Sequence, residues 1–234
     1  ARRRHRAREA RLARGERMGG WKIGFTNPEM WSIYGVCEPI WAHVYDTTVT
    51  RLTTNRATCS IGRFAEPKIE PEIVLHLRSA PPAGADPQSI LESVDWVAHA
   101  FEIVQSHFPG WRFQAADTVA DCSLHGTLLI GEPRPVERIA PDPAGALESF
   151  KLALSRNGEA RESGRGSNVL GSPLAAVAHL VAVLSRQPDG LPLQAGEIVT
   201  TGTITAAQPV RIGEVWHTEL QGIGLPGLTV EFVP

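Results

Sequence analysis

The 234-residue chain is poor in cysteine, carries nearly balanced charge and has no long apolar run. Its three cysteines are odd in number and lack the C-x-x-C spacing of paired metal ligands, which favours a reduced, cytoplasmic setting over a disulfide framework. A formal net charge of −2 gives no overall attraction to nucleic acid or to an anionic membrane. No apolar run approaches the roughly 20 residues that cross a bilayer. We therefore expect neither a nucleic-acid partner nor a membrane.

Two catalytic signatures are also missing. There is no G-x-S-x-G elbow, and neighbouring side chains on one strand rarely form a nucleophile–base pair, so Ser123 and His125 do not predict serine catalysis. The loop 164–167 contains glycines but matches no phosphate-binding fingerprint. Arg165 in this loop is nevertheless a candidate for the rim of a site that binds an anionic substrate.

Glycine and proline are abundant, with 22 and 18 copies, and they predict many turns between short strands. The hydrophobic share of 42% and the charged share of 21% are typical of a soluble globular protein. We find no linker and no internal repeat, so we expect one domain over residues 1–234. Residues 1–18 are rich in arginine and predict a helix that is solvated or packs on a neighbouring subunit. Because the chain begins with Ala1 rather than Met, we expect a trimmed N-terminus.

Cap and turn residues predict most of the remaining elements. Asp86-Pro87 starts a helix. Apolar residues at helical spacing over 90–101 extend this helix to about residue 100, and Glu102–Val104 indicates a new strand. Asn157-Gly158 predicts a type I′ hairpin turn, and Ser172-Pro173 predicts the start of another helix. Further strands are expected at 151–156, 159–163, 197–203, 213–220 and 228–233.

The stretch 67–75, Pro-Lys-Ile-Glu-Pro-Glu-Ile-Val-Leu, predicts a strand with two acidic side chains on one face. The Cα atoms of Glu70 and Glu72 should lie about 6–7 Å apart, at a rise of about 3.3 Å per residue. Two carboxylates at this separation repel each other, and a hard divalent cation would relieve that repulsion. Pro71 cannot donate to a ladder, which is typical of an edge strand or the rim of a cavity. Two ordinary solvent-exposed glutamates are the alternative interpretation.

Residues 19–26, Gly-Gly-Trp-Lys-Ile-Gly-Phe-Thr, predict another strand. Trp21, Ile23 and Phe25 alternate on one face, so Lys22 points to the opposite face. The flanking glycines permit a close approach of other backbone segments. Lys22 is either a plain surface lysine or a functional group that points inward.

Six segments, in this order across nearly the whole chain, resemble one family. They are GGWKIGFT, PKIEPEIV, FEIVQS, DTVADCSLHG, NVLGSP and GEIVTTGTITAA. The family is the hydratase/decarboxylase branch of the fumarylacetoacetate hydrolase superfamily, whose members include 2-keto-4-pentenoate hydratases and 4-oxalocrotonate decarboxylases of aromatic-compound catabolism. The resemblance implies an α+β, β-rich fold, a mixed β-sandwich or β-roll with flanking helices. It also implies a homo-oligomer.

The same resemblance implies a site for Mg²⁺ or Mn²⁺ made by Glu70, Glu72 and Glu102, with Lys22 as the active-site lysine. An unsaturated 2-oxo acid can chelate such an ion through its carboxylate and keto oxygens, which stabilises an enolate or dienolate. Lys22 would neutralise the substrate carboxylate or the developing negative charge, or transfer a proton. Expected substrate-binding residues are Lys68, Ser123, Arg165 and Thr203.

Hydration and decarboxylation share the dienolate, and the sequence leaves both open. A hydratase needs acid/base groups near the remote carbons, whereas a decarboxylase mainly needs an electron sink. Hydratases of this branch often carry an acid in a D-x-P-D-F/Y-G-like segment, and here Ile40 occupies the place of the second acid. This departure and the segment Thr203–Ala207 favour a decarboxylase. His125 also replaces the small residue expected in the D-N-x-S/A region, which leaves the shape of the substrate open.

Two other functions remain as alternatives. A carbon–carbon hydrolase acting on an acylpyruvate would look similar around the metal, but its lid His–Glu pair has no counterpart near the N-terminus. A non-catalytic protein that binds small acids would keep the fold without turnover. The presence of Lys22 together with three carboxylates argues against that function.

Overall fold

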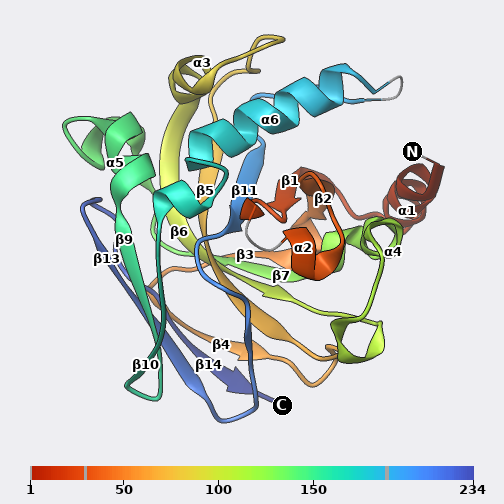
Figure 1. Ribbon diagram of the computed structural model, residues 1–234, viewed down its shortest axis with the longest axis vertical. Helices are drawn as coiled ribbons and strands as arrows, with labels where there is room; N and C mark the ends of the chain where they lie inside the picture. Colours follow the sequence, from red (N-terminus) through yellow and green to blue (C-terminus); the bar gives the residue numbers. More distant parts are fainter. Residues whose placement is uncertain (1, 29–30, 188–189) are drawn as a thin grey trace.

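Two β-sheets form the framework of the molecule (Figure 1). The computed structural model describes residues 2–28, 31–187 and 190–234. Within these residues, nine strands form a larger, curled sheet and five form a smaller one. The larger sheet contains β1 (Met18–Gly24), β2 (Ile40–Tyr45), β3 (Val49–Arg51), β5 (Lys68–Leu77), β6 (Val94–Val104), β7 (His125–Ile130), β8 (Arg134–Pro135), β11 (Ile198–Thr203) and β12 (Gln208–Pro209). The smaller sheet contains β4 (Arg56–Ser60), β9 (Lys151–Arg156), β10 (Glu159–Arg165), β13 (Val215–Gln221) and β14 (Thr229–Val233).

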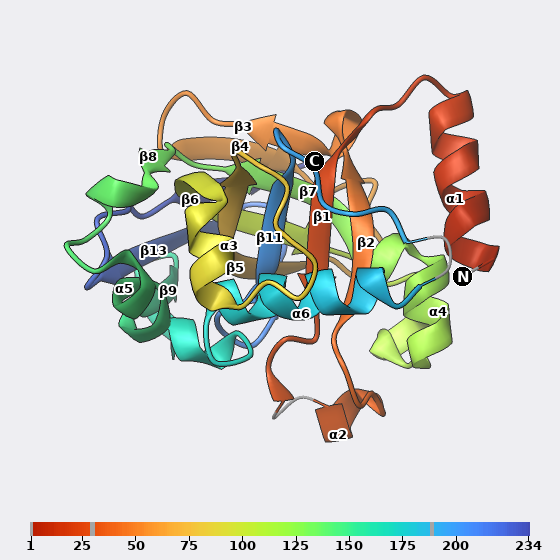
Figure 2. The same cartoon turned by 90° about the horizontal axis from the view of Figure 1, so that it is seen from above.

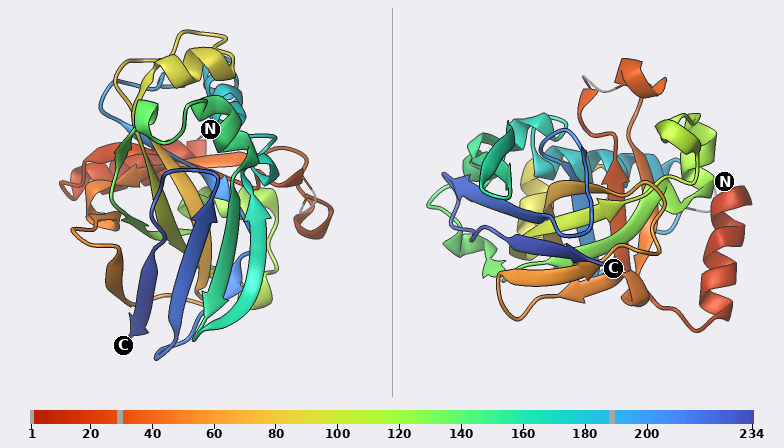
Figure 3. Two further views of the ribbon diagram at one scale, coloured as in Figure 1. Left: turned by 90° about the vertical axis from the view of Figure 1, so that its left-hand side faces the viewer. Right: turned by 90° about the horizontal axis from the view of Figure 1, so that it is seen from below.

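Helices flank this framework in two groups. The α-helices are α1 (Arg2–Ala13), α2 (Trp31–Tyr34), α3 (Pro87–Glu92), α4 (Ala115–Ala120), α5 (Pro143–Ser149) and α6 (Pro173–Ser185). Short 3₁₀ turns cover Asp46–Thr48, Pro109–Trp111, Cys122–Leu124, Val136–Arg138 and Gly166–Asn168. Helices α3 and α5 pack beside α6, whereas α1 lies against α4 at the other end (Figure 2). The smaller sheet faces the viewer in the left view of Figure 3. The expected strand-rich α+β fold with flanking helices is confirmed.

Strands β5 and β6 lie in the middle of the larger sheet, in the order β2-β1-β11-β5-β6-β7-β3. Most odd-numbered apolar residues of these two strands, among them Ile73 and Phe101, belong to the large hydrophobic core together with side chains of α6 and of the smaller sheet. Even-numbered residues such as Val74 and Ala98 belong to a second, smaller cluster on the opposite face. This alternation follows from the period of two in a strand.

The helix expected to reach about residue 100 is wrong beyond Glu92. Asp86 does cap α3, with its side chain accepting a hydrogen bond from the backbone N–H of Ser89. The chain then enters β6 at Val94, and this strand is buried on both faces. A strand buried on both faces shows no polar–apolar alternation, so its apolar residues matched helical spacing by chance.

Of the two alternatives for Pro71, an edge strand or the rim of a cavity, the edge strand is wrong, because β5 is paired on both sides. The carbonyl of Pro71 faces β11 and accepts a hydrogen bond from Ile204. Its nitrogen faces the same side, where the register of β11 breaks between Thr200 and Thr203. The missing N–H therefore falls at an irregular point of the ladder, where no regular bond is lost.

Three local predictions from turns, caps and apolar runs can be compared with the structure. Asn157 and Gly158 have positive φ of 52° and 81° and join β9 to β10, which confirms the hairpin. Ser172 caps α6 by accepting from the N–H of Ala175. The prediction that no apolar run approaches the length of a membrane span is wrong. By length and composition alone, the 20-residue segment Gly166–Ser185 is long and apolar enough to cross a membrane. Half of that window is buried, and the apolar face of α6 packs into the hydrophobic core.

Candidate metal centre and substrate pocket

Three carboxylates meet on the even-numbered face of β5 and β6. Glu70 and Glu72 lie two residues apart on β5, and Glu102 on β6 is the register partner of Glu70. One oxygen from each of the three side chains lies within 4.8 Å of the others. The predicted cluster is therefore assembled directly by strand pairing. Glu102 reaches the cluster directly from β6, which is paired with β5.

The three carboxylates differ in how firmly they are held. The two oxygens of Glu102 accept hydrogen bonds from Lys22 Nζ at 2.9 Å and from His125 Nδ1 at 2.6 Å. Glu72 uses only Oε2, which accepts from Thr200 Oγ1 and from the backbone N–H of Gly202. Glu70 is half-buried and, among the described residues, accepts no hydrogen bond.

Burial and mutual repulsion dominate the electrostatics of this cluster. Burial raises the pKa of Glu70 to about 7, although the Lys22 ammonium opposes the shift. Burial, together with the charges of Glu102 and Glu70, raises the pKa of Glu72 well above its ordinary value. Burial would also raise the pKa of Glu102, but Lys22 and the hydrogen bond from His125 outweigh it and lower that pKa to about 2. Two of the three carboxylates therefore resist ionisation unless a further positive charge is present.

The donor set fits a hard divalent cation. The Oε1 atom of Glu72 is buried and has no hydrogen-bond partner among the described residues. An unsatisfied buried acceptor is costly, and a cation between the three side chains would satisfy it. Carboxylate oxygens are the ligands that Mg²⁺ and Mn²⁺ prefer. Glu70, Glu72 and Glu102 are thus the residues that could hold such an ion.

Lys22 lies beside this cluster and is only 2% exposed. Burial alone would lower the pKa of Lys22, but the charges of Glu102, Glu70 and Glu72 outweigh it and raise the pKa above its ordinary value. The side chain is therefore an ammonium group held in a protected position. A divalent cation bound by the same carboxylates would offset their charge and weaken this upward shift.

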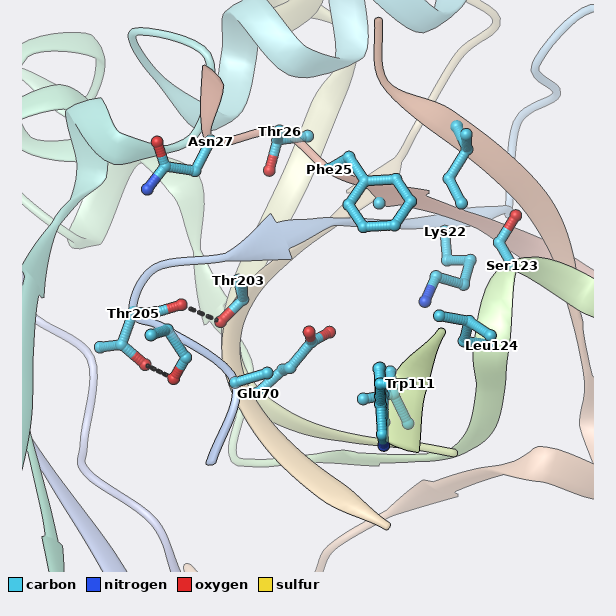
Figure 4. A pocket seen from close by; sticks show the side chains of 15 residues that line it. Lys22, Phe25, Thr26, Asn27, Glu70, Trp111, Ser123, Leu124, Thr203 and Thr205 are labelled. Carbon is cyan, nitrogen blue, oxygen red and sulfur yellow. Dashed lines mark hydrogen bonds between the residues drawn. The ribbon is translucent and has the colours of Figure 1, made fainter. Parts of the chain in front are cut away.

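A pocket opens next to Lys22 and Glu70, whose charged ends point toward one another across it (Figure 4). Its wall is mostly apolar and uncharged. Within the described residues, Lys22 and Glu70 are the ionisable side chains that line it. The remaining lining residues are Gly24, Phe25, Thr26, Asn27, Ile40, Val104, Trp111, Ser123, Leu124, Thr203, Thr205, Ala206 and Ala207.

Backbone strain is concentrated around this pocket. Four of its lining residues, Phe25, Trp111, Ser123 and Leu124, have positive φ between 54° and 64°. Ser123 and Leu124 follow Cys122, so three consecutive residues form a left-handed turn. Such conformations cost roughly 1–3 kcal/mol each and gather at functional sites.

A bulge in β11 brings backbone N–H groups to the cluster. Gly202 has a φ of 105°, and a Cβ at this position would lie 1.9 Å from Thr26 Oγ1. Glycine is therefore required both by its backbone conformation and by the close approach of Thr26. The consequence is that the N–H of Gly202 reaches Glu72 at 3.0 Å.

The predicted substrate-binding residues divide into three groups. Ser123 and Thr203 line the pocket. Lys68 lies next to it, with Nζ 3.9 Å above the ring of the pocket residue Trp111, and burial lowers the pKa of Lys68. Arg165 does not line this pocket and borders a separate cavity on the smaller sheet, with Lys151 and Glu219.

The arrangement around Ser123 does not support serine catalysis. Ser123 Oγ is buried and makes no hydrogen bond among the described residues. The ring of His125 is instead bound to Glu102 and, through Nε2 at 2.9 Å, to Thr48 Oγ1. The base required to activate the hydroxyl is therefore directed elsewhere.

Sequence reasoning missed several residues that shape the site. Thr26 has a buried hydroxyl without a described partner and lines the pocket, and its place in the GGWKIGFT segment was the available signal. Thr200 holds Glu72, and its place in the GEIVTTGTITAA segment was a similar signal. Trp111 arrives on a short 3₁₀ turn with no periodicity to indicate it. His125 departs from the small residue that the family resemblance implies, but its contact with Glu102 depends on strand register.

Comparisons with known proteins identify the family of the chain. Residues 37–231 match the model of the fumarylacetoacetate (FAA) hydrolase C-terminal family. A 2-keto-4-pentenoate hydratase from Paraburkholderia xenovorans is 32% identical over 92% of this chain and 77% of its own length. A 4-oxalocrotonate decarboxylase from a Pseudomonas species is 28% identical over 92% of this chain and 79% of its own.

A solved structure gives the same relationship in three dimensions. It is the 4-oxalocrotonate decarboxylase from Pseudomonas putida G7, complexed with magnesium and adipate, with a TM-score of 0.87, 26% identity and coverage of 98% of this chain and 83% of that one. The chain belongs to the fumarylacetoacetate hydrolase family. It is an enzyme of the hydratase/decarboxylase branch.

Proposed function

We propose that this enzyme is a divalent-metal-dependent lyase that decarboxylates an unsaturated 2-oxo dicarboxylic acid such as 2-oxo-3-hexenedioate. The observation that carries this choice is the pocket wall next to the acidic cluster. Among the described residues, it offers Lys22 and Glu70 as ionisable groups and places the apolar Ile40 beside them. Decarboxylation needs an electron sink and few proton donors, whereas hydration needs further acid/base groups.

Glu70, Glu72 and Glu102 would hold Mg²⁺ or Mn²⁺. When bound there, the ion would supply Lewis acidity toward the keto group of the substrate. The solved relative that contains magnesium also contains adipate, a six-carbon dicarboxylate. The proposed substrate has the same number of carbons and of carboxylate groups.

Lys22 would supply fixed positive charge where negative charge develops. In the reaction, the carbon–carbon bond to the departing carboxylate breaks, its electron pair enters the conjugated keto system, and carbon dioxide leaves. The keto oxygen gains negative charge, which a buried ammonium stabilises without reorganisation. We assign Lys22 this electrostatic role in preference to proton transfer.

The other predicted residues would bind substrate. Ser123 and Thr26 offer hydroxyls without described partners to oxygen atoms of the substrate. Lys68 offers positive charge beside Trp111, where it would favour a second carboxylate. Thr203 is tied to the carbonyl of Thr205, so we assign it to shaping the wall. Arg165 is far less suited to this role because it borders another cavity.

Hydration of a 2-hydroxy-2,4-dienoic acid is the second candidate. Its support is the 32% identity to a 2-keto-4-pentenoate hydratase. In that case Lys22 or Glu70 would have to move protons to the remote carbons as well as bind the substrate.

We also propose that the enzyme is cytoplasmic and homo-oligomeric. Its whole chain would form one catalytic domain, since the main hydrophobic core joins residues from Trp21 to Phe232.

Product analysis by NMR tests the proposal. The purified protein with Mg²⁺ or Mn²⁺ is given 2-oxo-3-hexenedioate labelled in the carboxylate that leaves, and separately 2-hydroxypenta-2,4-dienoate. We expect labelled carbon dioxide from the first substrate and no added water in the second. Hydration of the second substrate alone would replace the decarboxylase with the hydratase. Failure to consume either acid with either metal would reject the lyase.

A further inference from the structure

His125 lies directly behind one of the three clustered carboxylates and outside the pocket. It belongs to β7, and its side chain is only 1% exposed. Its Nδ1 lies 2.6 Å from Glu102 Oε1, and its Nε2 lies 2.9 Å from Thr48 Oγ1. The ring is therefore fixed at both nitrogens and cannot contact the substrate directly.

A β-bulge turns His125 to the face that carries Glu102. Thr127 pairs with Ile103, but the register then shifts and His125, not Gly126, pairs with Val104. Without this extra residue, His125 would pair one position further along and point to the opposite face. A Cβ on Gly126 would lie 2.6 Å from the carbonyl oxygen of Ile103, so glycine is required at the bulge.

The resulting contact holds Glu102 from two sides. Lys22 binds Oε2 and His125 binds Oε1, and the two donors come from different strands, β1 and β7. Rotation of the carboxylate group would break both bonds. Glu72 is held through Oε2 alone and Glu70 accepts no hydrogen bond among the described residues, so Glu102 is the member of the cluster that is held at both oxygens.

We infer that His125 is a positioning residue that fixes Glu102 in the orientation required to bind the divalent cation. The inference rests on the metal site of the proposed function and adds a residue to it. The family resemblance implies a small residue at this position, whereas this chain has a histidine there. Groups that orient metal ligands typically contribute a factor of about 10–100 to metal affinity.

Titration with Mn²⁺, followed by the EPR signal of the free ion, tests this role without relying on turnover. We expect His125→Ala to weaken Mn²⁺ binding about 10–100-fold. His125→Asn should stay within about threefold of the original protein, because its amide can donate to Glu102 as Nδ1 does. Melting curves of each variant show whether it is folded.

The matched control is His76→Ala. His76 Nδ1 lies 2.6 Å from Asp95 Oδ1, so this pair has the same separation, but it is more exposed and Asp95 is not a member of the acidic cluster. Loss of the His76 side chain should leave Mn²⁺ affinity unchanged. If His125→Ala fails to fold, Thr48→Val removes the anchor of Nε2 while keeping the ring, and it should weaken binding in the same direction.

The outcomes separate this inference from the proposed function. If the unmodified protein binds Mn²⁺ and the folded His125→Ala binds it equally well, the positioning role is wrong and the metal site stands. Equal losses in His125→Ala and His125→Asn would also overturn it, because the hydrogen-bond donor would not matter. If the unmodified protein binds no Mn²⁺, the metal site and the inference both fail.

Discussion

The paired strands β5 and β6 present two very different faces to the rest of the molecule. On one face, Ile73, Phe101 and their odd-numbered neighbours are completely buried in the large hydrophobic core. On the other face, a small apolar cluster around Val74 gives way to the acidic side chains Glu72 and Glu102. One strand pair thus carries both the main packing surface and the candidate metal site.

The difference shows how the fold accommodates a group of buried carboxylates. Such groups are costly to bury without a cation, and their raised pKa values express that cost. The opposite face supplies apolar burial at the same positions along the chain. A register slip of one residue would exchange the two faces and destroy both. Stability and function should therefore respond to substitutions on different faces.

The largest expected effect is the loss of activity in Glu72→Gln. The amide oxygen can still accept from Thr200 and Gly202, but it carries no charge for a cation. Losing several kcal/mol of transition-state stabilisation corresponds to a decrease of at least about 10³-fold in kcat/KM. Steady-state kinetics with and without added Mg²⁺ check this. The free energy of unfolding of the metal-free protein should not fall by more than about 1 kcal/mol. Full activity would reject Glu72 as a ligand.

Ile73 lies on the core-facing side of β5, the strand that carries Glu70 and Glu72. Its replacement in Ile73→Ala should lower stability and leave metal binding almost unchanged. The side chain is 0% exposed in the large core, and its truncation should lower the free energy of unfolding by about 3 kcal/mol. Urea denaturation measures that loss. Mn²⁺ affinity at 10 °C should remain within about twofold, because no ligand is altered. A large loss of affinity in the folded variant would show that the two faces are not independent.

Lys22→Met removes the ammonium group while keeping an unbranched side chain. We expect kcat to decrease by about 100-fold, because the fixed charge opposite the developing anion is lost. Metal affinity should change less than kcat, since the loss of one support for Glu102 is partly offset by the removal of a competing positive charge. Rapid-quench kinetics at saturating metal separate these effects. An unchanged kcat would exclude Lys22 from the reaction.

The smallest effect concerns pH. In the metal-free protein the pKa of Glu70 is about 7, so this carboxylate is ionised above pH 7 and increasingly protonated below it. Protons should then compete with the cation at Glu70, and also at Glu72, whose pKa is raised as well, so Mn²⁺ affinity should fall by at least about tenfold per pH unit below pH 7. Calorimetry in two buffers with different ionisation enthalpies would detect the released proton. A constant affinity between pH 8 and pH 6 would contradict this assignment.

The sequence predicted those parts of the site that depend on local periodicity. Alternation placed Glu70 and Glu72 on one face of a strand and separated Lys22 from Trp21 and Ile23. It was wrong for Phe25, which follows the end of β1 with a positive φ and lines the pocket with Lys22. These relations depend only on the geometry of an extended chain. The resemblance to a family then added Glu102, which periodicity alone could not place.

What the sequence could not predict depends on pairing between distant segments. The contact between His125 and Glu102 requires the bulge at Gly126, and a register shift leaves no reliable local signal. Charge and loop context predict that Arg165 binds an anionic substrate, but β10 carries it to the other sheet. The β6 error has a similar cause, because a fully buried strand and a buried helix are equally apolar.

The left-handed turn over Cys122–Leu124 has a practical consequence for engineering. Each L-residue there costs roughly 1–2 kcal/mol relative to the right-handed form, and glycine would avoid most of that cost. Screens for heat tolerance should therefore enrich glycine at Cys122 and Ser123, whose side chains are small, but not at Leu124, whose side chain is buried. Screens for narrow substrate choice should retain the side chains of Ser123 and Leu124, since these form part of the pocket wall. The two selections would drive the same short segment in opposite directions.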